Sequence, residues 1–195
     1  MPIRPALRPA RLLVPVAGIL LPGLLAPGAA LAHPGHGEAM GLAAGFAHPL
    51  GGLDHVAAMV AVGLIAALRG GRALWLLPLV FLAMMALGAG AGMLGLPLPF
   101  AEAGILASLV AFGLLTVFGR GLPLALLAGL LGAFAVFHGH AHGVEMPETA
   151  SGLRYSLGFL GATALLHAAG LGLGLLIGLA GGAKPGIARS RAARP

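Results

Sequence analysis

The sequence predicts an all-α fold, a polytopic bundle of transmembrane helices, and three observations lead to this expectation. The chain of 195 residues is 59% hydrophobic and only 8% charged. A water-soluble domain of this size cannot bury so much apolar surface, whereas a lipid bilayer can cover it. Beyond the N-terminal region, five apolar stretches each approach the ~20 residues that a helix needs to cross the hydrocarbon layer. Short segments rich in glycine, proline and arginine separate these stretches.

Residues 1–32 have the three regions of a secretory signal peptide. Three arginines within this segment precede the apolar stretch LLVPVAGILLPGLL at residues 12–25, and ALA at residues 30–32 provides small residues for cleavage before His33. An uncleaved first span is the alternative, but the prolines of this segment and its Ala-x-Ala end favour cleavage. We therefore expect a mature chain that begins at His33.

Residues 33–182 are expected to form one transmembrane domain, and residues 183–195 a basic cytoplasmic tail. The five expected spans lie near residues 50–68, 73–94, 101–119, 121–142 and 154–180. Lysine and arginine accumulate on the cytoplasmic side of membrane proteins. With the mature N-terminus outside, the basic residues that fall inside are Arg69, Arg72, Arg120, Lys184, Arg189, Arg191 and Arg194. Only Arg154 then falls outside, so we expect an external N-terminus and a cytoplasmic C-terminus.

The segment FHGHAHGVE, residues 137–145, concentrates ionisable groups at the outer end of the fourth expected span. Such groups at membrane depth are usually functional. On a helix that turns about 100° per residue, His138, His142 and Glu145 share one face, while His140 points almost opposite. Imidazoles four residues apart can chelate one divalent ion, and a carboxylate one turn later adds negative charge. The pattern therefore predicts a metal site rather than a histidine-rich loop.

A second cluster, HPLGGLDH at residues 48–55, begins the first expected span. Its proline and glycines interrupt the backbone, which is tolerated at membrane depth where the chain lines a cavity or is buried in protein. Asp54 can be a metal ligand, a hydrogen-bond acceptor that fixes the tautomer of His55, or a helix N-cap. The N-cap interpretation does not account for the histidines at both ends of the segment, His48 and His55.

The last expected span carries small residues and one histidine on a single face. This face holds Thr163, His167, Gly170, Gly174 and Gly178. The glycines predict close approach of another helix, from the same chain or from a second subunit of a homo-oligomer. His167 is then either a packed, hydrogen-bonded residue or a relay for an ion in the middle of the membrane.

Other glycines and polar residues give weaker signals. Gly88 and Gly92 predict a similar helix contact in the second span, whereas Gly139 and Gly143 could unravel the end of the fourth. Glu102 is interpreted as a carboxylate at a helix start, favourable beside the positive end of the helix dipole.

His33 and His36 would begin the mature chain, either as a site that gathers ions at the entrance or as a solvated tail.

Composition excludes several functions. The chain has no cysteine, so nitrogen and oxygen ligands suit divalent nickel, cobalt or zinc better than copper(I). No P-loop motif is present, and the basic residues occur in short patches with few aromatics. We therefore expect no nucleotide, nucleic-acid or prosthetic-group partner. The sequence has no HExxH motif and no obvious nucleophilic serine near the histidines, so we do not expect an enzyme.

The two clusters, HPLGGLDH and FHGHAHGVE, resemble the signature segments of the HupE/UreJ family of nickel and cobalt permeases. The resemblance extends over nearly the whole chain. It implies a bacterial inner-membrane protein that imports nickel or cobalt for metalloenzymes such as hydrogenase or urease. Family members are often counted with six spans, a number that here requires the signal segment or residues 38–48 to count as one. The metal-site positions that the resemblance implies are His48, Asp54, His55, His138, His142 and Glu145.

Three functional hypotheses follow from these residues. The favoured one is a permease for nickel, or alternatively cobalt or zinc. The second is an intramembrane zinc hydrolase with Glu145 or Asp54 as general base. The third is a metal-binding accessory or sensor protein without transport.

Overall fold

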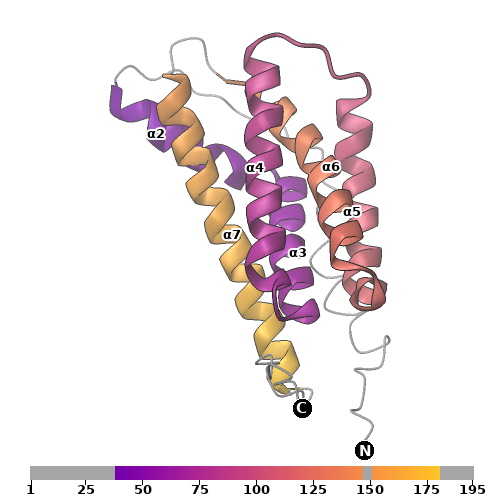
Figure 1. The fold of residues 1–195 in the computed structure, drawn as a ribbon. Helices are drawn as coiled ribbons and strands as arrows, with labels where there is room; N and C mark the ends of the chain where they lie inside the picture. The colour runs from indigo at the N-terminus through magenta and orange to yellow at the C-terminus, as the bar shows by residue number, and fades with distance from the viewer. Residues whose placement is uncertain (1–37, 147–150, 181–195) are drawn as a thin grey trace, which may run out of the picture.

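The computed structural model describes residues 38–146 and 151–180, which form a bundle of α-helices (Figure 1). The elements in chain order are α2 (Glu38–Ala47), the 3-10 helix η1 (His48–Leu50), α3 (Leu53–Arg69), α4 (Ala73–Met93), α5 (Ala101–Phe118), the 3-10 helix η2 (Gly119–Gly121), α6 (Leu124–Val144) and α7 (Gly152–Ala180). The expected signal peptide, His33, His36 and the basic tail lie outside the described residues.

The predicted fold class is confirmed, because the described chain is helical and contains several helices of membrane-spanning length. Four segments are long and apolar enough to cross a bilayer, namely α4, α5 continued by η2, α6 and α7. A bent pair, residues Gly41–Leu50 followed by Leu53–Arg69 with an angle of 82° between its two helices, is either a fifth, broken span or a re-entrant loop. The chain is thus a multi-pass membrane protein. Where a single span near residues 50–68 was expected, the structure has this bent pair of helices.

The bend between the two helices of this pair comes from the residues around the junction of η1 and α3. Pro49 lacks a backbone N–H and occupies the start of η1. Gly52 has an extended backbone, with φ −108° and ψ 120°, and serves as the N-cap of α3. The chain therefore turns sharply after Leu50, so that His48 precedes the bend and His55 follows it within the first turn of the new helix.

Glycines hold α4 tightly against α6. A Cβ atom added to Gly139 or Gly143 would collide with the backbone carbonyls of Met85 and Ala89 on α4. In the reverse direction, a Cβ on Gly88 would collide with the carbonyl of Val136 on α6. The expected unravelling at Gly139 and Gly143 is wrong: α6 runs unbroken to Val144, because close packing against α4 supports its backbone.

Glycines also bring α7 against α3 of the same chain. Gly170 faces the carbonyl of Val60, and Gly174 faces the side chain of Ala67. The predicted helix contact is confirmed at these two positions. At Gly178 an added Cβ would meet no atom of the described chain within 4 Å, so a contact there with a second subunit stays a prediction.

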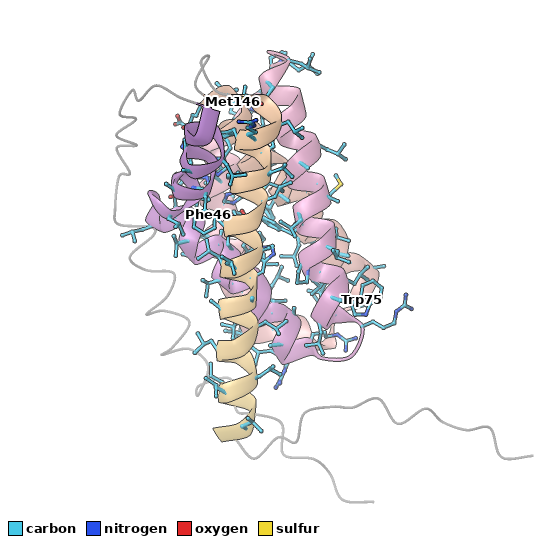
Figure 2. The ribbon with its side chains drawn as sticks, turned by 90° about the vertical axis from the view of Figure 1, so that its left-hand side faces the viewer. Phe46, Trp75 and Met146 are labelled. Atoms are coloured by element: carbon cyan, nitrogen blue, oxygen red, sulfur yellow. The ribbon has the colours of Figure 1, made fainter. Side chains whose placement is uncertain are left out.

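The bundle has two distinct ends. The histidine end is where α6 finishes and α7 begins, and the arginine end is where α3 meets α4 and α5 meets α6. Figure 2 shows Met146 at the histidine end and Trp75 near the arginine end. Arg69, Arg72 and Arg120 all belong to the connections at the arginine end. There the Nε of Arg120 donates a hydrogen bond of 2.7 Å to the carbonyl of Leu68.

Candidate metal site

The fold joins the two histidine clusters at the histidine end of the bundle. The ring of His142 on α6 lies 4.8 Å, between centroids, from that of His48 in η1 and 4.2 Å from that of His55 on α3. The ring of His138, one turn earlier on α6, lies 5.1 Å from that of His55. Four imidazoles from distant parts of the sequence therefore form one continuous group, the joined histidine group.

The outer part of this group combines His48, His142 and Glu145, whose potential ligand atoms all lie within 4.8 Å of one another. His48 Nε2 donates a hydrogen bond of 3.0 Å to Glu145 Oε2, and His142 Nδ1 lies 4.0 Å from the same oxygen. Glu145 follows the last residue of α6, and the hydrogen bond from His48 lowers the pKa of its carboxyl below the usual value. The group therefore carries a negative charge at its exposed edge.

The hydrogen bonds of His55 identify the nitrogen that it can offer to a metal. Asp54 Oδ1 lies 3.1 Å from His55 Nδ1, and a carboxylate can only accept, so Nδ1 carries the proton. The other nitrogen, Nε2, is buried and has no hydrogen-bond partner among the described residues. Asp54 thus acts as the acceptor that fixes the tautomer, and the N-cap interpretation is wrong because Gly52 occupies that position.

Ser108 on α5 fixes the tautomer of His138. The Ser108 hydroxyl donates its only proton to the carbonyl of Ile105 at 2.6 Å, so it must accept from His138 Nε2 at 2.8 Å. His138 Nδ1 is then a lone-pair nitrogen, buried and without a partner in the described chain. The hydroxyl proton points away from the imidazole, and therefore this pair does not have the arrangement of a nucleophile and its base.

His142 connects the outer and inner parts of the site. It is 2% exposed, and neither of its ring nitrogens makes a hydrogen bond within the described residues. Its ring packs on Phe159 with a centroid separation of 4.2 Å. A buried polar atom without a partner costs about 1–3 kcal/mol. The inner part of the group consists of His55, His138 and His142, each of which has at least one such nitrogen. Among the described residues, only the outer part, His48, His142 and Glu145, has donor atoms all within 4.8 Å of one another, so the outer part is the candidate metal site and the inner imidazoles lie next to it.

Two other predicted residues lie outside this group. His140 Nε2 donates a hydrogen bond of 2.7 Å to the carbonyl of Leu96, so His140 points away from the cluster, as its helical position predicted. His167 is buried in the middle of α7 and packs against Phe81 of α4. Glu102 is exposed in the first turn of α5, in agreement with a helix-start carboxylate.

Sequence reasoning missed three residues of the site, Ser108, Phe81 and Tyr155. Ser108 accompanies the histidines without the arrangement of a nucleophile, and the available signal for it was a hydroxyl within an otherwise apolar span. The ring of Tyr155 lies 5.8 Å from that of His48, and its hydroxyl is buried without a partner among the residues described. A cavity of about 40 Å³ between α4 and α7 is lined by Tyr155 and His142, and it has room for water beside the site.

The fold and site together define a polytopic helical membrane protein with nitrogen and oxygen donors gathered inside the bundle, next to one of its ends. Comparison with known proteins places it more closely. The model of the family described as HupE / UreJ protein matches residues 20–192. The chain is 43% identical over 156 residues to Protein HupE of Rhizobium leguminosarum bv. viciae, covering 80% of this chain and 81% of that protein. No solved structure matches. The chain belongs to the HupE/UreJ family.

Proposed function

We propose that the protein is a permease that imports divalent nickel, or alternatively cobalt, through the joined histidine group. The observation that carries this proposal is the set of buried imidazole nitrogens left without partners, among the described residues, on His55, His138 and His142. Imidazole ligands without thiolates suit divalent nickel and cobalt. Membership of the HupE/UreJ family supports the same cargo.

The overlap of the two parts of the site gives a route for the ion. The exposed carboxylate of Glu145 and His48 would attract a hydrated cation at the histidine end. His142 belongs to both parts, so a cation can exchange Glu145 and His48 for His55 and His138 without losing all its protein ligands. Conduction requires binding that is strong enough to replace hydration and weak enough to release the ion. Exchange among neighbouring imidazoles meets this requirement better than a closed cage.

The proposed direction of transport follows from the charges at the two ends. Arg69, Arg72 and Arg120 at the arginine end support a cytoplasmic location of that end by the positive-inside rule. Cations would then enter at the histidine end. An inside-negative membrane potential contributes ~2.3 kcal/mol per charge per 100 mV, which is sufficient to drive accumulation of a divalent cation.

Uptake of radiolabelled nickel into proteoliposomes tests this proposal. We expect saturable uptake, competed by cobalt more strongly than by magnesium, and its loss in His138→Ala and Asp54→Ala. His140→Gln is the matched control, because glutamine keeps a donor for the Leu96 carbonyl outside the joined histidine group.

Nickel binding without flux above protein-free vesicles would contradict transport and favour an accessory or sensor protein. Equal uptake by all variants would contradict the assignment of the site.

A further inference from the structure

His167 has a combination of features that a purely structural histidine lacks. It lies near the middle of the 29-residue helix α7 and is 2% exposed. Neither ring nitrogen has a hydrogen-bond partner in the part of the chain that the structure describes. The expectation of a packed, hydrogen-bonded histidine is therefore not met. Leaving such an imidazole unpaired is costly, as at the joined histidine group nearer the histidine end.

Phe81 of α4 connects His167 with that group. Its ring lies 5.3 Å, between centroids, from the ring of His167 at an interplanar angle of 85°, and 6.1 Å from the ring of His138. Phe81 itself is fully buried. Together with the contacts among His48, His142, His55 and His138, these two contacts make an unbroken series of rings from the exposed edge of the site to the middle of the bundle.

The residues around His167 leave its nitrogens available to a ligand. Gly63 of α3 packs on the backbone carbonyl of His167, which fixes the helix but does not engage the ring. Thr163, one turn earlier on the same face of α7, donates its hydroxyl proton to the carbonyl of Phe159 at 3.0 Å. Its oxygen keeps lone pairs that can accept, but the hydroxyl gives no proton to the imidazole.

We infer that His167 is a second, inner binding position for the transported cation, and that the Phe81 ring separates it from the joined histidine group. This inference rests on the proposed transport function and deepens it. An ion held by His138 must pass the Phe81 ring to reach His167, so rotation of that ring would open the way. When the ring is in place, it prevents a continuous file of water between the two positions. The aromatic face also attracts a passing cation more than an aliphatic side chain would.

The absence of cysteine from the sequence allows a test that does not depend on transport. In purified, full-length His167→Cys, a cation that reaches position 167 binds the introduced thiolate, so we expect a cobalt–sulfur charge-transfer absorption band on addition of Co²⁺. Ala168→Cys is the matched control, because Ala168 is the next residue of α7 and faces outward. The inference is overturned if the His167→Cys variant gives no more absorption than the Ala168→Cys variant.

A flux measurement provides the second arm and covers the case in which His167→Cys fails to fold. We expect His167→Gln to bind nickel within about twofold of the wild type, since the joined histidine group is intact, while uptake into proteoliposomes falls at least tenfold. Unchanged uptake in His167→Gln would overturn the inference while leaving the permease proposal standing. Failure of the wild type to transport would instead contradict the permease proposal. The cobalt–sulfur absorption of His167→Cys would still decide whether the cation reaches position 167.

Discussion

The histidine end and the arginine end of the bundle use the same helices in opposite ways. At the histidine end, a bent pair of helices, buried imidazoles and two carboxylates are brought together, with several nitrogens left unpaired among the described residues. At the arginine end, the interior is filled by apolar side chains such as Leu64, Leu77 and Leu127. The Arg120 side chain also caps the last turn of α3 through the Leu68 carbonyl.

This difference shows how the bundle can maintain a costly polar site. Unpaired buried nitrogens lower stability, whereas apolar packing raises it. Because α4, α6 and α7 connect the two ends of the bundle, the well-packed half and the glycine contacts stabilise the half that holds the site (Figure 1). Three predictions sharpen this comparison.

The largest predicted effect is a loss of folding stability in Gly139→Ala. This substitution inserts a methyl group into the closest contact between α4 and α6 at the histidine end. Overpacking costs typically 1–3 kcal/mol, and the obstacle here is backbone, so we expect a loss of about 3 kcal/mol. Thermal unfolding in detergent measures it. Gly129→Ala on the same helix is the control, because an added Cβ there meets none of the described atoms within 4 Å. Equal melting temperatures for the two variants would show that the glycine contact is not what supports the site.

The second prediction concerns nickel affinity and compares two side-chain hydroxyls on α5. Ser108 orients His138, whereas Thr116, two turns closer to the arginine end, bonds only the carbonyl of Phe112 in its own helix. Loss of a residue that orients a metal ligand costs about 10–100-fold in metal affinity. We therefore expect this loss for Ser108→Ala and none for Thr116→Val, measured by nickel binding calorimetry. A similar loss in both variants would mean that the hydroxyls act through stability rather than through His138.

The smallest effect is expected for Tyr155→Phe, which removes a buried hydroxyl that lacks a partner among the described residues. If the hydroxyl contacts water of the incoming ion in the adjoining cavity, its removal costs one hydrogen bond, or about three- to tenfold in nickel affinity. The melting temperature should not fall, because no hydrogen bond within the described chain is lost. A lower melting temperature with unchanged affinity would place Tyr155 in the scaffold instead of the site.

The sequence predicted much of this molecule because its strongest signals are local. The apolar stretches became α4 to α7 within three residues of their expected ends, since their length and hydropathy already fit a bilayer. Helical periodicity placed His138 and His142 on one face and His140 on another, and the hydrogen bond from His140 to Leu96 agrees. The metal roles of these histidines stay predictions.

Other features depended on residues that are neighbours only in space. Ser108 has no sequence relation to His138, and Phe81 none to His167, so no spacing rule could pair them. For the same reason, Gly139 was expected to unravel α6, whereas in the structure it allows α6 to pack closely against α4. A glycine in an isolated helix weakens it, but a glycine against a neighbouring backbone allows close packing.

The sequence by itself determined the fold class, the approximate spans and the residues available for metal chemistry, because hydrophobicity and helical periodicity act along the chain. Only the three-dimensional structure decided which nitrogen His55 and His138 leave free. That choice depends on hydrogen bonds to Asp54 and Ser108, and the bond to Ser108 forms only when α5 packs beside α6. The contacts of the Phe81 ring with His138 and with His167 were decided in the same way, by the packing of α4 against both α6 and α7.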